Sequence, residues 1–378
     1  MAYTVLARRY RSQDFDEVVG QEAVAQTLKN AIAQGRVAHA YLFVGTRGVG
    51  KTSMARIFAK SLAGGSPEVD RAIMTGQDTD VIEIDAASNR GVDEARELIA
   101  NCIYRPLRGK FKVYIVDEVH MLTTEAFNAL LKTLEEPPEH VKFVLCTTEA
   151  HKVPATIQSR CQRFDFRNLT SSEIAGHLRA VCQKENVPAD PDLLFAIGRL
   201  AAGSMRDGLS LLDRVMAAAG NGQRLTRELL EKLLGLPQQE LVAALVDALS
   251  SSDPGAALQK ADALLARGVA MDQLLDTLID RLRSLMLIAA CGESTPLVEA
   301  SDELRRELAQ QARAFDAASL VHMIALCESV QRGSKSSFAP RALLDALVVR
   351  LAMTEKIADL AALVALPKPA DTGPQKKA

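Results

Sequence analysis

A glycine-rich stretch near the N-terminus has the residue types and spacing that bind phosphate. It is Gly45-Thr46-Arg47-Gly48-Val49-Gly50-Lys51-Thr52, which fits the pattern GxxxxGKT. In this pattern the glycines let backbone N–H groups surround the anion, the lysine reaches the β- and γ-phosphates, and the threonine hydroxyl binds Mg²⁺. The stretch therefore predicts a site for a nucleoside triphosphate and Mg²⁺.

An acidic pair further along the chain supplies a second part of such a site. The apolar residues 113–116 are followed by Asp117 and Glu118. A buried strand of this kind delivers the residue at its carboxyl end to the edge of the sheet where the phosphate loop lies. We expect Asp117 to hold Mg²⁺ and Glu118 to polarise the attacking water.

The elements that must position these residues alternate between helix and strand. A helix with Val24, Leu28 and Ile32 on one face precedes the apolar run 40–44, and the phosphate loop leads into a helix from about 52 to 62. Further short apolar runs, typical of strands buried on both faces, lie at 81–84, 113–116 and 143–146. The pattern predicts an α/β P-loop domain with a parallel sheet.

The second half of the chain has a helical pattern only. It begins after Leu169 with Thr170 and Glu173 spaced as a capping box, and Gly235 and Pro237 indicate a break between helices. We expect four parts: a nucleotide-binding α/β domain at 1–169, a small helical lid at 170–236, an all-α collar domain at 237–362, and a disordered tail or linker at 363–378.

The composition excludes several other classes of protein. With 48% hydrophobic residues, 24% charged residues and a net charge of −2, the chain is typical of globular proteins, and no apolar stretch has the roughly 18 residues of a membrane span. The six cysteines form no CxxC pair, which favours reduced thiols in a cytoplasm. The absence of Trp argues against binding single strands by rows of stacked bases.

Longer stretches around these motifs resemble the clamp-loader ATPases of the bacterial DNA polymerase III gamma/tau family, within the AAA+ class. They are residues 41–52, 84–89, 116–122 and 127–138 and the motif Ser159-Arg160-Cys161. The resemblance covers about residues 1–240 most strongly. It implies an ATPase, with ATP and Mg²⁺ as its cofactors, that opens a sliding clamp and loads it onto primed DNA, and in which hydrolysis triggers release.

The resemblance also implies roles for single residues. Thr148 matches the polar sensor that contacts the γ-phosphate or the water. Arg160 matches the arginine finger that reaches into the ATP site of a neighbouring subunit, and Arg206 matches the second sensor, in the first turn of a lid helix. Arg11 and Val19 match the segment that contacts adenine.

Duplex DNA is expected to be contacted through its backbone. We expect helix starts at Ser88, Asn89 and Arg90 and around Lys132 to present N–H groups and cations to the phosphates, although ordinary solvated charges explain these residues equally well. As partners the resemblance implies delta- and delta-prime-type subunits, further copies of this chain and the sliding clamp. It also implies polymerase and helicase, bound through a longer form, and a cytoplasmic place at the bacterial nucleoid.

The interval from Ser61 to Asp80 departs from the family pattern. Family members usually carry a four-cysteine zinc module there, whereas this interval has no cysteine and shows only a short connection at 63–67; we predict no bound zinc. Three alternatives stay open: a replication factor C-like motor, a branch-migration motor, and a nucleotide-binding structural subunit of a clamp loader. The intact Lys51, Asp117 and Glu118 argue against a subunit that has lost ATP chemistry.

Overall fold

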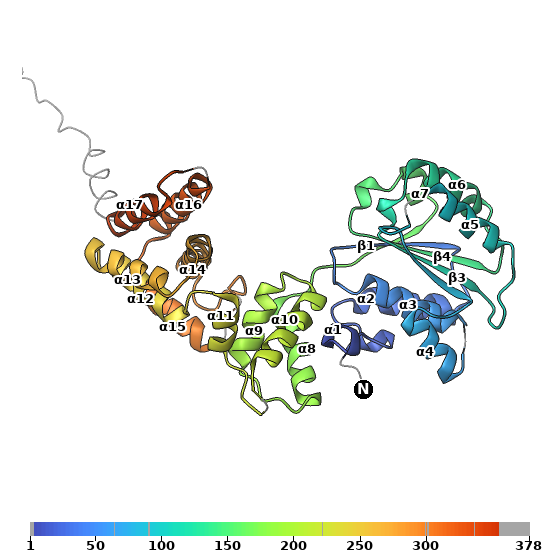
Figure 1. Cartoon of the computed structure of the whole chain (residues 1–378), viewed down its shortest axis with the longest axis horizontal. Helices are drawn as coiled ribbons and strands as arrows, with labels where there is room; N and C mark the ends of the chain where they lie inside the picture. Colours follow the sequence, from blue (N-terminus) through green and yellow to red (C-terminus); the bar gives the residue numbers. More distant parts are fainter. Residues whose placement is uncertain are drawn as a thin grey trace, which may run out of the picture. The chain divides into compact units, whose positions relative to one another are not determined.

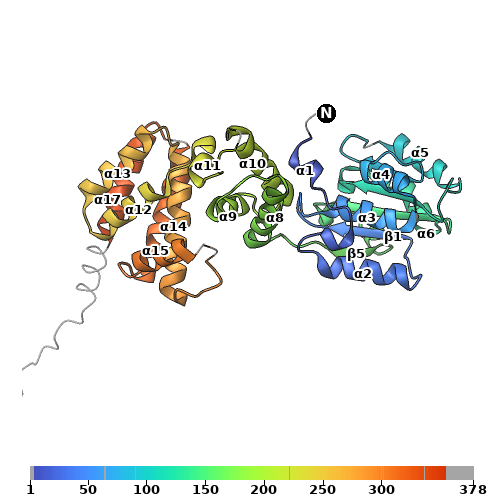
Figure 2. The same cartoon turned by 90° about the horizontal axis from the view of Figure 1, so that it is seen from below.

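The computed structural model describes residues 4–354, except residues 64, 90, 221, 299, 301 and 336. The chain divides into two compact units, Met1–Leu225 and Thr226–Ala378, whose elements are labelled in Figures 1 and 2. Within the described part, every helix is too short or too polar to span a lipid bilayer. The tail predicted at 363–378 lies outside the described residues.

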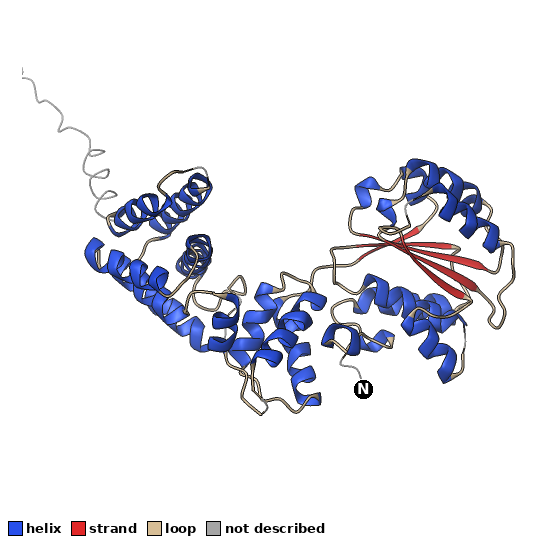
Figure 3. Cartoon of the chain, in the orientation of Figure 1, coloured by secondary structure: helices blue, strands red, loops and turns tan. Residues whose placement is uncertain are grey.

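The first unit is built on a five-stranded sheet in which all neighbouring strands are parallel (red in Figure 3). The strands are β1 (Ala40–Val44), β2 (Val81–Asp85), β3 (Lys112–Asp117), β4 (Val141–Thr147) and β5 (Gln162–Asp165), in the spatial order β2-β3-β4-β1-β5. The predicted parallel sheet is confirmed. The sequence analysis did not predict β5, because only Phe164 of this edge strand is buried and no apolar run marks it.

Alternate strand residues point to opposite sides of the sheet. Because both faces are apolar, helices cover each of them. Tyr41 and Phe43 of β1 pack under α2 (Glu22–Ala33), α3 (Lys51–Ala63) and α4 (Pro67–Thr75). Leu42 packs on the other face, under α5 (Val92–Cys102), α6 (Thr124–Glu135) and α7 (Ala155–Gln158) (Figure 1). The phosphate loop thus lies in a three-layer α/β domain.

Helix α4 begins at Pro67, at the end of the stretch 63–67 in which the sequence predicts a short connection. Pro67 stands in its first turn, where a missing N–H costs nothing. Gly76 ends the helix in the left-handed conformation, with φ of +75°. The helix is short and its buried apolar residues are few, namely Ile73 and Met74, so no long apolar pattern marks it in the sequence.

Three helices complete the first unit: α8 (Ser171–Lys184), α9 (Pro191–Leu200) and α10 (Met205–Ala218). The predicted capping box at the start of α8 is confirmed, because the Thr170 side chain accepts from the Glu173 N–H and the Glu173 carboxylate accepts from the Thr170 N–H. The short elements of this unit are α1 (Leu6–Arg9) and the 3-10 turns η1 (Phe15–Glu17), η2 (Val119–Met121) and η3 (Ala150–Lys152).

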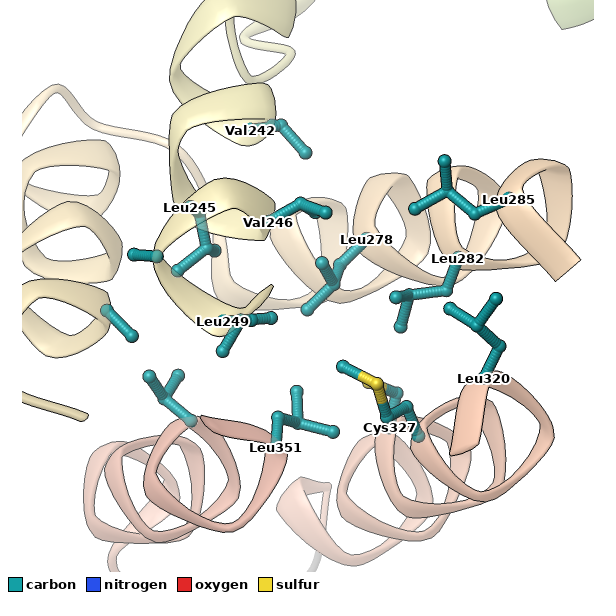
Figure 4. Packing of buried hydrophobic residues seen from close by; sticks show 14 of the residues in the cluster. Val242, Leu245, Val246, Leu249, Leu278, Leu282, Leu285, Leu320, Cys327 and Leu351 are labelled. Atoms are coloured by element: carbon teal, nitrogen blue, oxygen red, sulfur yellow. The ribbon is translucent and has the colours of Figure 1, made fainter. Parts of the chain in front are cut away.

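In its described part the second unit consists of helices packed around a core of leucine and valine. They are α11 (Arg227–Leu234), α12 (Gln239–Ser250), α13 (Pro254–Ala266), α14 (Met271–Cys291), α15 (Asp302–Ala312), α16 (Ala317–Ser334) and α17 (Pro340–Ala352). Leu245 of α12, Leu282 of α14 and Leu351 of α17 meet in this core (Figure 4). Gly235 ends α11 with φ of +66°, as the predicted helix break requires.

Candidate nucleotide-binding site

The loop between β1 and α3 has the backbone that its glycines predict. Gly48 and Gly50 have φ of +80° and +104°, a region that residues with a Cβ rarely adopt. A Cβ on Gly45 would lie 2.7 Å from the Phe166 carbonyl oxygen. The loop ends where α3 begins, at Lys51, so free N–H groups and the positive end of the helix dipole lie at its tip. This arrangement can bind an anion.

The Lys51 side chain lies inside this loop. Its Nζ donates to the carbonyl oxygens of Gly45 at 2.6 Å and Thr46 at 2.8 Å. Burial lowers the pKa of the Lys51 ammonium, and the nearby carboxylates of Glu118 and Asp117 oppose that shift. The lysine is thereby held by the loop carbonyls and lies near two carboxylates.

The strand order brings the acidic pair beside the loop. Asp117 is the last residue of β3, and its Oδ2 accepts from the Thr52 hydroxyl at 2.7 Å while its Oδ1 accepts from the Glu118 N–H at 3.0 Å. Glu118 has φ of 48°; a left-handed conformation in a glutamate stores strain of about 1 kcal/mol or more. Such strain is typical of functional positions.

Thr148 lies between the loop and the acidic pair because β4 separates β1 from β3. It follows the last residue of β4, and its hydroxyl donates to Glu118 Oε2 at 3.0 Å. The backbone of Gly45 donates to the Thr147 carbonyl at 3.2 Å, which joins the phosphate loop to the same strand end. The residue expected to act as a sensor thus contacts the residue expected to polarise water.

These groups surround one pocket in the first unit. The predicted residues that line it are Arg11, Val19, Arg47, Gly48, Val49, Gly50, Lys51, Thr52, Asp117, Glu118 and Arg206. Gly45, Thr46 and Thr148 are not among its lining residues. Burial lowers the pKa of Arg11, and the neighbouring Arg56 and Arg206 guanidiniums add to that shift. The pocket is therefore lined by several cations and by the two carboxylates of Asp117 and Glu118.

The lid reaches the pocket through the start of α10. The Ser204 side chain accepts from the Asp207 N–H at 3.2 Å, so Ser204 caps the helix and Arg206 lies in its first turn, as predicted. The Met205 N–H donates to the Gly48 carbonyl at 3.1 Å. Loop and lid are thus directly bonded, and a shift of α10 moves Arg206 with it.

Sequence reasoning missed several residues of this pocket, among them Tyr10, Ser53 and His177. Tyr10 and Ser53 adjoin predicted residues and could have been included on that ground. His177 lies in the middle of α8, where no motif marks it. Burial lowers the pKa of His177 and so favours its neutral form.

Family models match most of the chain. The model described as DNA polymerase III, delta subunit matches residues 20–170, the clamp loader subunit ATPase lid domain matches 173–222, and the DNA polymerase III subunits gamma and tau domain III matches 198–365. The DNA polymerase III subunit gamma of Buchnera aphidicola is 39% identical over 307 residues, which is 79% of this chain and 83% of that protein. The chain belongs to the DNA polymerase III gamma/tau family. Membership of this family also confirms the AAA+ fold class that the sequence predicts.

Longer members of the gamma/tau family extend beyond the matched region. The DNA polymerase III subunit tau of Bacillus subtilis is 40% identical over 373 residues, which is 95% of this chain and 65% of that protein. The chain spans between half and two thirds of the length of the first such relatives. Among solved structures, the Thermotoga maritima RuvB Holliday junction branch migration motor matches at 19% identity over 64% of this chain and 79% of that chain, with a TM-score of 0.48.

The arginine that matches the finger of the gamma/tau family does not line this pocket. Arg160 follows α7, and its guanidinium donates to the Thr156 carbonyl at 2.6 Å and to Glu135 Oε1 at 2.5 Å. Its side chain is 33% exposed. Arg160 is not among the described residues that line the pocket.

The residues expected at helix starts near DNA are arranged differently. Ser88 and Asn89 lie in a turn held by Asp85, whose carboxylate accepts from the Ser88 hydroxyl, and α5 begins only at Val92. Lys132 is exposed in the last turn of α6. The expected helix starts were therefore wrong, because a side-chain-capped turn delays α5. Arg90 lies outside the described residues.

The chemistry of the donors fits Mg²⁺. Thr52 and Asp117 present hydroxyl and carboxylate oxygens, the ligands that this hard cation prefers. Elsewhere in the described residues, no group of three or more His, Cys, Asp or Glu side chains is arranged to hold a metal ion. The expectation of no zinc stays a prediction.

Proposed function

We propose that this chain is an ATP-hydrolysing motor subunit of a DNA polymerase III clamp loader, acting on nucleoid DNA in the bacterial cytoplasm. The observation that carries the proposal is the convergence of Lys51, the Thr52–Asp117 pair and Glu118 on one pocket, with Thr148 hydrogen-bonded to Glu118. They come from three separate strand ends. The expected parts, 1–169, 170–236 and 237–362, serve as motor, lid and oligomerisation collar.

The roles of the pocket residues follow from their chemistry. The loop N–H groups and Lys51 bind the phosphates of ATP, Arg11 and Val19 flank the base, and Arg206 brings the lid toward the phosphates. Thr52 and Asp117 hold Mg²⁺, which when bound neutralises charge on the phosphates.

Hydrolysis needs an oriented water molecule. Glu118 accepts a hydrogen bond from that water and polarises it, and Thr148 fixes the carboxylate through its own hydrogen bond. The pairing of these two side chains at 3.0 Å supports this assignment.

Arg160 acts on the ATP site of a neighbouring subunit. Its exposure, its absence from the lining of its own pocket and its pairing with Glu135 support a role in trans, where a guanidinium stabilises charge in the transition state. Such a finger increases the rate by about 10³- to 10⁵-fold. Hydrolysis then depends on assembly with delta-type subunits or further copies of the chain.

Clamp and DNA are bound at the surface. Ile103, Tyr104 and Leu107, which follow α5, are 75%, 66% and 78% exposed, and an exposed apolar group of this kind is typical of a protein-binding site. Ser88, Asn89 and Lys132 remain candidates for contacts with the backbone of primed DNA.

ATPase assays of the chain alone, and then with its partner subunits, clamp and primed DNA, test the proposal. Lys51→Ala is expected to abolish ATP hydrolysis both by the chain alone and by the assembly. Arg160→Ala is expected to leave ATP binding intact and to remove the stimulation that assembly causes, whereas Arg163→Ala, a neighbouring exposed arginine paired with Asp165, serves as the matched control. A chain that binds ATP without hydrolysing it in any assembly would instead be a structural subunit.

A further inference from the structure

A buried histidine connects the ends of β3 and β4 beside the acidic pair. His120 lies in η2, and its side chain is 5% exposed. Its Nδ1 is 3.0 Å from Thr147 Oγ1 and 3.5 Å from Glu118 Oε2, and its Nε2 is 3.3 Å from Glu149 Oε1. The imidazole thus contacts three side chains of the catalytic neighbourhood, although it does not line the pocket.

The partners of the ring determine where its protons lie. A carboxylate only accepts hydrogen bonds, so the Nε2 that faces Glu149 carries a proton, whereas Nδ1 is closer to the Thr147 hydroxyl, at 3.0 Å, than to the Glu118 carboxylate, at 3.5 Å. In the neutral ring Nδ1 is then the acceptor, and the Thr147 hydroxyl donates to it. The Thr147 oxygen in turn accepts from the Glu149 N–H at 3.0 Å. Each group in this small network has a partner, so the network holds the ring in one orientation.

This network lies where the sheet itself no longer joins the two strands. The backbone pairing of β3 with β4 ends at Val116 and Leu145. Beyond that point two side-chain contacts bridge the strand ends. His120 contacts Thr147 at 3.0 Å, and the Thr148 hydroxyl donates to Glu118. Thr147 and Thr148 are consecutive. The contact of His120 with Thr147 therefore also fixes the backbone of Thr148, whose hydroxyl donates to Glu118.

We propose that His120 is a positioning residue for ATP hydrolysis: by holding Thr147 it fixes the end of β4, and so places Thr148 against Glu118. The inference rests on the proposed function, in which Glu118 polarises the attacking water. A shift of about 1 Å in a group that orients a reactant can cost about 100-fold in rate. Nothing in this role requires His120 to contact ATP.

The first test separates chemistry from binding. In the assembled loader, His120→Ala is expected to lower kcat about 10- to 100-fold and to change ATP affinity less than about twofold, because His120 lies outside the pocket lining. His120→Asn sets an amide oxygen near the position of Nδ1 and is expected to restore most of kcat. His140→Gln is the matched control, since His140 contacts the Cys102 carbonyl near the start of β4.

The second test asks whether the two residues act as one unit. Thr147→Val keeps the shape of the buried side chain, which is 0% exposed, and removes its hydroxyl. The single substitutions His120→Ala and Thr147→Val are expected to lower kcat by similar factors, and the double variant no further. Melting curves by circular dichroism confirm that each variant is folded.

Several outcomes would overturn the inference. They are an unchanged kcat in folded His120→Ala, failure of His120→Asn to restore activity, or losses that multiply in the double variant. A failure of the proposed function itself looks different: the wild-type loader would then hydrolyse no ATP, or Glu118→Gln would hydrolyse it as fast as wild type. The two failures are therefore distinguished within one series of assays.

Discussion

Gly48 is the point at which the phosphate loop meets the lid, and Gly48→Ala tests whether that close approach matters. The residue has φ of +80°, and a Cβ there would lie 2.0 Å from the Ser204 Oγ and 3.2 Å from the Arg206 Cβ. Ser204 is the residue that caps α10. An alanine therefore both strains the loop and displaces the cap that positions Arg206.

The two costs can be worked out separately. A left-handed alanine costs about 1 kcal/mol relative to glycine, and loss of a serine N-cap costs about another 1 kcal/mol. We expect Gly48→Ala to lower the free energy of unfolding of the first unit by about 2 kcal/mol. Gly35→Ala is the matched control: its φ is +66° and its Cβ would meet nothing within 4 Å, so it should lose only about 1 kcal/mol.

Urea unfolding followed by circular dichroism measures both losses, since the chain has no Trp to report by fluorescence. ATP affinity should fall in Gly48→Ala and stay unchanged in Gly35→Ala. In a Ser204→Ala background the cap is already lost and the hydroxyl is absent, so Gly48→Ala should cost less than it does in wild type. Equal losses of unfolding free energy in Gly48→Ala and Gly35→Ala would refute the close approach between loop and lid.

Three further predictions concern stability. Leu282→Ala, at a fully buried position of the second unit (Figure 4), should lower the free energy of unfolding by about 3 kcal/mol, while Leu297→Ala at a position 55% exposed should change it by less than about 0.5 kcal/mol; urea unfolding measures both. Arg281 is 4% exposed and bonds Gln311 Oε1 at 2.6 Å, so Arg281→Ala should cost about 2 kcal/mol or more by the same method, because a buried polar group loses its partner. The Arg167 guanidinium holds the pKa of Glu173 at about 2; since this folded value is depressed, its stabilisation is present above the unfolded pKa and is lost as pH falls toward 2. The difference in urea midpoint between wild type and Glu173→Gln should therefore shrink between pH 6 and pH 3, and a difference that grows would contradict the assignment.

The parts of the fold that the sequence predicts are those whose burial is complete. Residues 113–116 and 143–146 are buried on both faces of the sheet, so each strand is an uninterrupted apolar run. The edge strand β5 has exposed residues on either side of Phe164, and its place in the sheet comes from pairing with β1. Pairing between segments that are about 120 residues apart leaves no local signal.

The residues of the site also differ in how far the local sequence predicts them. The phosphate loop and Asp117 are local motifs, because the backbone shape and the strand end that they need are encoded by neighbouring residues. His177 is brought to the pocket by the packing of α8, and its spacing along the chain carries no information. His120 stands two residues after Glu118, so its place is local, and only its contact with Thr147, 27 residues further on, depends on the fold.

One segment joins the two halves of the proposed mechanism. Residues 147–160 begin at Thr147, include Thr148 against Glu118, and end at Arg160. The Gln158 amide donates to the carbonyl oxygens of Ala150 and Val153, at 3.0 and 2.9 Å, which braces η3 against α7. Because the segment is bonded at its start and braced along its length, the placement of Thr148 and the placement of Arg160 are mechanically linked. Under the proposed function a substitution in this segment therefore affects two ATP sites, its own and that of the neighbouring subunit.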